Sequence, residues 1–188
     1  MSDDVDGILG EARHKMEQAV AHAKEELAKI RTGRANPGLV ADLPVDYYGS
    51  RTPLQQLAGV SVPEPRTLLI NPYDPSAREG IEKAIRDADL GLNPSTDGEV
   101  IRVAFPELSE ERRKEYVRYA RERAEEGRVA VRNVRRQAKS DVERLARDGD
   151  LAEDDADRAE RRLQGLTDDH VGRIDAALEA KQQELLEV

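Results

Sequence analysis

Apolar residues recur every three or four positions along residues 4–30, and this spacing predicts an amphipathic helix. Its apolar side consists of Ile8, Ala12, Met16, Ala19, Ala23, Leu27 and Ile30. The pattern stops at Thr32-Gly33, and the turn-forming run Asn36-Pro37-Gly38 prevents the helix from resuming. The first element of the chain is therefore one long helix with a defined end.

A different pattern holds between Pro37 and Pro106, where all nine prolines of the chain lie. Short apolar runs bounded by turn residues replace the helical spacing, and they predict strands. The expected strands cover residues 45–48, 66–70 and 100–103. One short helix is expected over residues 76–89, with its isoleucines facing the strands. This region predicts a small α/β unit that interrupts a helical sequence.

Helical spacing returns after the proline-rich region, with apolar residues at regular steps from 117 to 145. The pattern predicts one helix of about 35–40 residues, roughly 55 Å long, with Ser109 as its N-terminal cap. Asp148-Gly149-Asp150 ends that helix. A final helix follows, for which Asp150 and Glu153 resemble a capping box.

None of the three long helices can bury its apolar side alone, so we expect them to pack as an antiparallel three-helix bundle. The sequence predicts an α+β protein in which residues 1–30 and 107–188 form the bundle and residues 34–104 form an inserted β/α/β domain. Two short crossings between domains favour a hinge over a rigid joint. The hinge residues are Arg31, Thr32, Gly33, Phe105 and Pro106. One continuous fold is the alternative.

Composition excludes several function classes. The chain has no cysteine, which excludes disulfides and thiolate chemistry, and its three histidines lack the spacing of metal ligands. No apolar run approaches the roughly 18 residues of a membrane helix, and the acidic first residues differ from targeting peptides. Phosphate-binding glycine motifs and the nucleophile elbow are absent, and we find no catalytic constellation. We expect a soluble, cytoplasmic protein that is not an enzyme and needs no metal or cofactor.

Charge is distributed unevenly along the chain, whose net charge is −9. Residues 1–111 carry a net charge of −8, residues 112–147 carry +7, and residues 148–188 carry −8. Within the middle segment, residues 127–140 contain five cations and no acidic residue. These cations, which we call the basic face, are Arg128, Arg132, Arg135, Arg136 and Lys139.

Four members of the basic face each follow an apolar position by one residue, so they share one side of the helix over about 16 Å. None of its arginines has an acidic residue four positions away, whereas Arg118 has Glu122 and Arg121 has Glu125. Unpaired guanidinium groups in a row suit RNA phosphates, which they bind with two parallel hydrogen bonds. The alternative is a solvated helix face that pairs with the acidic final helix. The partners would be Asp154, Asp155, Asp157 or Glu160.

Several sequence blocks along the chain carry a more specific signal. In order they are Ile30–Pro37, Tyr47–Gly49, Pro53–Ala58, Arg66–Leu68, Ile81–Ile85, Asp89–Pro94, Glu110–Lys114, Arg128–Arg136 and Leu166–Asp168. Taken together and in register, these blocks resemble the bacterial ribosome recycling factor family over essentially the whole chain.

The resemblance implies an L-shaped protein with a tRNA-like outline. Family members act after translation termination, when the bundle binds the 23S ribosomal RNA of the large subunit between the two subunits. Elongation factor G, using GTP, then splits the ribosome, so that mRNA and deacylated tRNA are released. The resemblance also assigns RNA binding to Arg132 and Arg135, with Arg128 and Arg136 beside them.

A factor of this kind would act as a monomer and would catalyse no covalent step itself. The alternative of a different class is a helical adaptor whose basic face binds an acidic protein. Binding to ribosomes with a steep salt dependence would favour the translation factor over the adaptor. An enzyme is a weaker third hypothesis.

Overall fold

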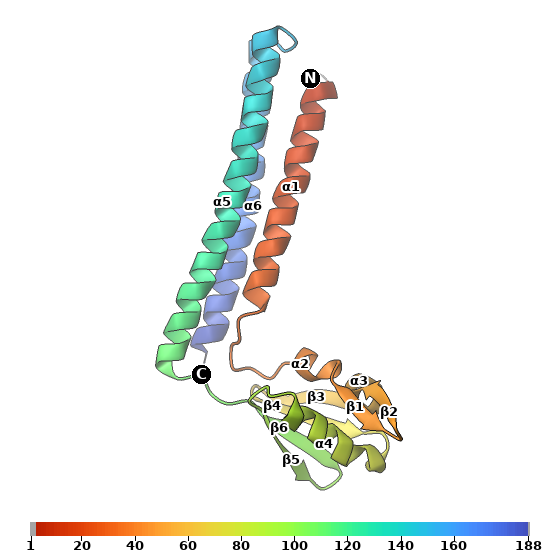
Figure 1. Ribbon diagram of the computed structural model, residues 1–188. Coiled ribbons are helices and arrows are strands. Elements are labelled where there is room, and N and C mark those ends of the chain that lie inside the picture. Colours follow the sequence, from red (N-terminus) through yellow and green to blue (C-terminus); the bar gives the residue numbers. More distant parts are fainter. Residues whose placement is uncertain (1–2, 188) are drawn as a thin grey trace. The chain divides into compact units, whose positions relative to one another are not determined.

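The computed structural model describes residues 3–187. Its internal contacts divide the chain into two units. One unit comprises the residues up to Arg31 and those from Glu110 onward, and the other comprises Thr32–Ser109 (Figure 1). Long helices thus occur together with a small antiparallel sheet, which confirms the predicted α+β class.

The first unit is a bundle of α1 (Asp3–Ala28), α5 (Glu110–Asp148) and α6 (Glu153–Leu186). Helix α5 runs antiparallel to both α1 and α6, and each helix packs against the other two (Figure 1). The 39 residues of α5 agree with the length that its apolar spacing predicts. The spacing works as a guide here because each helix buries one side only.

Small and aliphatic side chains fill the core of the bundle. Its buried members include Val5, Leu9, Met16, Val20, Ala124, Val131, Val142, Leu163 and Ile174. Gly127 is also buried, and a Cβ atom placed on it would lie 2.8 Å from Cβ of Ala23 and 3.1 Å from Cδ1 of Ile174. Glycine at this position therefore lets the three helices approach closely.

The second unit contains a two-stranded hairpin and a four-stranded sheet. The elements before the sheet are α2 (Gly38–Ala41), β1 (Pro44–Tyr47), β2 (Ser50–Pro53) and α3 (Leu54–Leu57). The strands of the sheet are β3 (Ala58–Glu64), β4 (Thr67–Pro72), β5 (Asn93–Asp97) and β6 (Val100–Ala104). Their spatial order is β3-β4-β6-β5, and all neighbours are antiparallel.

Helix α4 (Arg78–Asp87), which follows a short 3-10 turn at Pro75–Ala77, packs against β1, β5 and β6. It buries Ile81 and Ile85 in the same core as the sheet residues Leu68 and Ile101. The helix and the three strands expected in this region are present, within a few residues of their predicted bounds.

One sequence prediction about helix ends is wrong. Asp150 and Glu153 do not form a capping box, because α6 begins at Glu153 and its N-cap residue is Ala152, which has no side chain able to cap. Asp150 instead lies just after the end of α5, where its backbone N–H donates to the carbonyl of Leu145 at 3.0 Å. The connection between α5 and α6 is thus closed by backbone hydrogen bonds.

Candidate nucleic-acid interface

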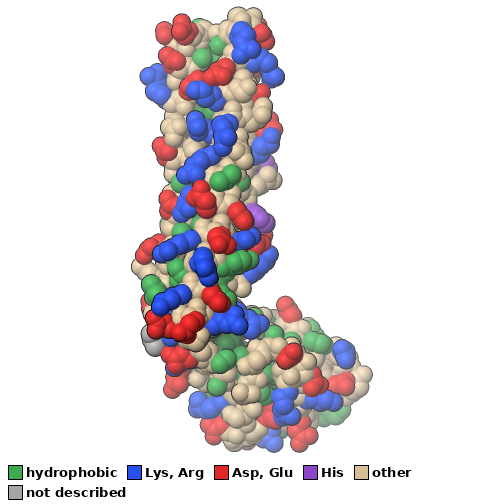
Figure 2. Space-filling view, turned by 60° about the vertical axis from the view of Figure 1, so that its left-hand side comes forward, with side chains coloured by type: hydrophobic (Ala, Val, Ile, Leu, Met, Phe, Trp, Pro, Cys, Tyr) green, Lys and Arg blue, Asp and Glu red, His purple; other side chains and the backbone are tan. Residues whose placement is uncertain are grey.

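The basic face lies on α5, and its position follows from the residues that α5 buries. Val131 and Ala138 point into the core, and the cations that follow them are turned toward one flank of the helix. That flank adjoins α6, whereas the opposite flank, with Val134 and Gln137, lines a hollow together with α1 residues. Figure 2 turns the α5 side forward and shows basic side chains recurring along it, interspersed with acidic ones.

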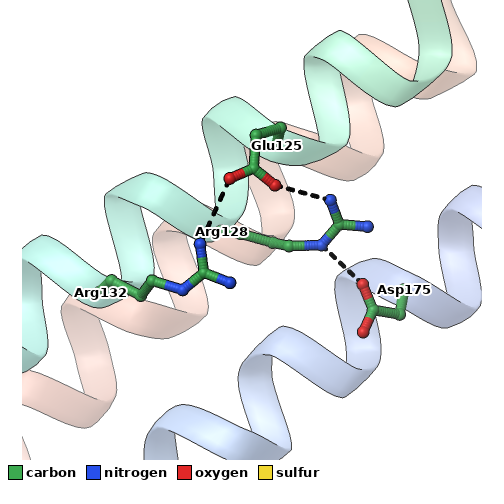
Figure 3. Close-up of polar contacts among 4 residues, drawn as sticks. All are labelled: Glu125, Arg128, Arg132 and Asp175. Atoms are coloured by element: carbon green, nitrogen blue, oxygen red, sulfur yellow. Dashed lines mark hydrogen bonds and ion pairs between the residues drawn. The ribbon is translucent and has the colours of Figure 1, made fainter. Parts of the chain in front are cut away.

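Arg128 is held by two carboxylates (Figure 3). Its Nε donates to Oδ1 of Asp175 on α6 at 2.6 Å, and its Nη1 donates to Oε2 of Glu125 at 2.9 Å. Only 19% of the Arg128 side chain is exposed. The hydrogen bond from Arg128 also lowers the pKa of Glu125, which therefore stays ionised to a lower pH than an ordinary glutamate.

Arg132 and Lys139 also have acidic partners. Nη1 of Arg132 donates to the second oxygen of Glu125 at 3.3 Å. Nζ of Lys139 lies 3.1 Å from Oε2 of Glu160 on α6 and 3.7 Å from Oε1 of Glu143. Glu160 is one of the partners that the solvated-face alternative names.

The expectation that Arg128 and Arg132 are unpaired is therefore wrong. The four-residue spacing of helical ion pairs does not include Glu125, which lies three residues before Arg128 and seven before Arg132. It also misses Asp175, because that residue is adjacent only through the packing of α6 on α5.

Two arginines of the basic face remain available. Within residues 3–187, neither Arg135 nor Arg136 has a carboxylate partner, and Arg135 is half-buried while Arg136 is exposed. Two pairs that the sequence predicts on the same helix, Arg118 with Glu122 and Arg121 with Glu125, are not formed in this part of the chain. The free cations of α5 thus differ from those that spacing alone indicates.

The two chain crossings lie beside each other in the second unit. Gly33 has a φ of 77°, and a Cβ atom on it would lie 3.6 Å from the carbonyl oxygen of Pro106 and 3.5 Å from Cγ of Leu108. The backbone N–H of Phe105 donates to the carbonyl of Arg66 at 2.8 Å, and Phe105 is 8% exposed within the sheet core.

The remaining crossing residues are more accessible. Arg31 is exposed, and Thr32 is half-buried. Beyond them, the backbone N–H of Ala35 donates to the carbonyl of Pro65 at 2.8 Å. Ala35 and Phe105 are thereby both tied to the turn between β3 and β4.

The described residues offer no site of another kind. Among residues 3–187, no three His, Asp or Glu side chains lie close enough to hold a metal ion. In the same part of the chain, no helix combines the length and apolar character that crossing a membrane requires. The basic face of α5 is therefore the feature with the clearest binding chemistry.

The sequence is similar to known proteins over almost the whole chain. The family model for ribosome recycling factor matches residues 23–186. The ribosome-recycling factor of Nocardioides sp. is 56% identical over 184 residues, which cover 98% of this chain and 100% of that protein. The protein of the same name from Thermobifida fusca is 54% identical over the same coverage.

Solved structures give the same result. A solution structure of ribosome recycling factor aligns with a TM-score of 0.76 and 45% identity, and the alignment covers 100% of both chains. A second structure models the T. thermophilus ribosome recycling factor and the E. coli elongation factor G bound to the E. coli post-termination complex. It aligns with a TM-score of 0.64 and 46% identity, over 97% of this chain and 99% of that one. On sequence and fold together, the chain belongs to the ribosome recycling factor family.

Proposed function

We propose that this protein docks its helical bundle on the 23S ribosomal RNA of the large subunit after translation termination. Elongation factor G and GTP then split the ribosome, and mRNA and deacylated tRNA leave. Membership of the family makes the chain a translation factor and not an enzyme. The partner assignment is supported by the similar T. thermophilus factor, whose structure is described with elongation factor G on a post-termination complex.

The observation that carries the RNA assignment is the pair of free guanidinium groups on α5. Within the described residues, Arg135 and Arg136 have no carboxylate partner, although the protein as a whole carries a net charge of −9. Contacts with phosphates would release counterions from the RNA and satisfy both groups. The acidic remainder of the molecule repels other phosphate surfaces, so it favours docking through this face.

The members of the basic face have different roles in this proposal. Arg135 and Arg136 contact phosphates directly. Arg132 and Lys139 are partly exposed and exchange their carboxylate partners for phosphate on binding. Arg128 is a positioning residue, because its two hydrogen bonds and its burial fix α5 against α6.

We also infer a hinge at the two crossings. Bending is assigned to Arg31, Thr32, Gly33 and Pro106, which lie next to the hydrogen bonds that fix Ala35 and Phe105 in the inserted domain. Phe105 then anchors the inserted domain at the edge of the hinge. The chain has no cysteine, so a Lys24→Cys/Glu99→Cys variant can carry a fluorophore pair across the hinge. A single, narrow distance distribution both free and on ribosomes would contradict the hinge.

The proposed setting is the cytoplasm, where the protein acts as a monomer without a cofactor. The adaptor hypothesis makes a different prediction, because it requires an acidic protein partner and no ribosome. Binding to purified large subunits tests the two hypotheses directly. Saturation at one copy per subunit, with affinity falling steeply as salt rises, supports the recycling factor. Absence of binding to ribosomes would favour the adaptor.

A further inference from the structure

Five arginines of α5 form no ion pair within the described residues, and four of them share one side of the helix; the fifth, Arg147, lies near the C-terminal end of α5. Arg118 and Arg121 lie toward its N-terminal end, and Arg135 and Arg136 lie further along. In the part of the chain that the structure describes, none of the four forms an ion pair. At 3.6 residues per turn, all four fall within a sector of about 100° around the helix axis.

Glu125 pairs with other arginines and not with Arg121. Arg121 and Glu125 have the spacing of a helical ion pair, but each oxygen of the Glu125 carboxylate accepts from another arginine. One accepts from Arg128 and the other from Arg132 (Figure 3). Within the described residues, Arg121 is exposed and forms no ion pair.

Between the two arginine pairs, Arg128 and Arg132 have acidic partners. Arg128 and Arg132 contribute two positive charges, which Glu125 and Asp175 neutralise. Val129, which follows Arg128, is an apolar side chain 41% exposed in the same stretch. The centres of the arginine pairs are about 24 Å apart at 1.5 Å per residue, so one straight helix presents two separate positive points.

We propose that Arg118 and Arg121 form a second contact with RNA backbone phosphates, separate from that of Arg135 and Arg136. This inference rests on the proposed function, because it assumes that the α5 side of the bundle binds ribosomal RNA. RNA fits the arrangement better than an acidic peptide does. A folded RNA presents backbone phosphates at points this far apart, and the arginine fork matches each of them.

The test uses the full-length Arg118→Gln/Arg121→Gln variant, because glutamine keeps the length and helix propensity of the side chain. Its affinity for purified large subunits is measured across a range of salt concentrations. We expect affinity to fall about 5- to 50-fold, and the slope of log affinity against log salt to decrease by about 1–2, since each lost phosphate contact removes about 0.7–0.9. Arg161→Gln is the matched control. Arg161 is exposed on α6, has no carboxylate partner in residues 3–187, and should leave both quantities unchanged.

Two outcomes would overturn the proposal. The first is an unchanged affinity, and the second is a weaker affinity with an unchanged salt slope, which would mean that no phosphate contact was lost. An Arg135→Gln/Arg136→Gln variant separates this failure from failure of the proposed function. If Arg135→Gln/Arg136→Gln binds weakly while Arg118→Gln/Arg121→Gln binds normally, only the proposed contact of Arg118 and Arg121 is wrong. If neither variant loses affinity, the RNA-binding assignment of α5 is wrong as well. Circular dichroism of each variant verifies that the bundle is folded.

Discussion

Arg128 joins two helices of the bundle to each other, since its Nε donates a 2.6 Å hydrogen bond to Oδ1 of Asp175. The same guanidinium group binds Glu125 one turn earlier on its own helix. A run of basic residues that looks uniform in sequence therefore contains both a structural residue and free cations. Stability and RNA binding should respond to different members of the run.

The first prediction compares Arg128 with Arg136. Arg128→Ala should lower the free energy of unfolding by about 1–2 kcal/mol, because it removes two hydrogen bonds to charged groups and the packing of a side chain only 19% exposed. Arg136→Ala should change it by less than about 0.5 kcal/mol, since Arg136 is exposed. Urea denaturation measures both. For ribosome affinity the larger effect should come from Arg136→Ala, which should weaken the free energy of binding by about 1–3 kcal/mol. If Arg128→Ala had the larger effect on both stability and ribosome affinity, the separate structural and RNA-binding roles of these two residues would be refuted.

The second prediction concerns Glu125, the acidic residue beside the free arginines. Glu125→Gln removes a carboxylate that occupies Arg132 and repels phosphate. Affinity for large subunits should therefore rise about 2- to 5-fold at low salt, and the gain should shrink as salt increases. Glu179→Gln, a change of the same charge on α6, serves as the control. Weaker binding of Glu125→Gln would show that the carboxylate assists docking.

The third prediction uses two helical glycines. Gly127→Ala should destabilise the bundle by about 1–3 kcal/mol, because its Cβ atom would lie 2.8 Å from Cβ of Ala23, where no flexible side chain can move aside. Gly172→Ala should instead stabilise the protein by about 0.5–1 kcal/mol, since nothing lies within 4 Å of its new Cβ and alanine favours the helix. Thermal unfolding of the two variants should shift in opposite directions. A shared shift would mean that the close approach at Gly127 is unimportant.

The fourth prediction concerns the pH dependence of the inserted domain. The hydroxyl of Tyr47 donates to Oδ2 of Asp74 at 2.6 Å, and this hydrogen bond raises the pKa of Tyr47 to about 12 and lowers the pKa of Asp74. Tyrosine absorbance should therefore show one group that ionises near pH 12. That ionisation should be absent in Tyr47→Phe. It should occur at a lower pH in Asp74→Asn and should be unchanged in Tyr73→Phe.

The sign of the effect on stability follows from the two shifts. The raised pKa of Tyr47 stabilises the folded state below about pH 10, and this contribution is lost as pH rises toward 12. The lowered pKa of Asp74 stabilises the folded state above its ordinary pKa of 3.8, and this contribution is lost as pH falls through the lowered value. Tyr47→Phe should therefore flatten the loss of stability above pH 10. An identical profile in wild type and variant would contradict the assignment.

Sequence pattern predicts the bundle well because its helices are long and one-sided. Residues such as Met16, Val131 and Ile174 repeat at steps of three and four over many turns, so the helical period dominates the pattern. The edge strands are harder to detect. Strand β5 is polar and mostly exposed, and the second half of β3 is exposed as well, so neither shows an apolar run.

The candidate site was predictable only in part. Its location on α5 follows from the local excess of basic residues, which can be counted directly in the sequence. Local charge does not tell whether each cation has an acidic partner. Asp175, for example, lies 47 residues from Arg128 in sequence and is brought to it by the packing of the helices. Two i, i+4 pairs, at Arg118 and Arg121, are likewise absent from the described residues although their spacing permits them.

The central claim is that this chain splits post-termination ribosomes through RNA contacts made by α5. Light scattering of post-termination ribosomes, mixed with the protein, elongation factor G and GTP, measures that splitting directly. Scattering should drop only when all three are added, and it should drop more slowly with Arg135→Ala than with Arg161→Ala. No drop with a cognate elongation factor, or equal rates for the two variants, would contradict the central claim.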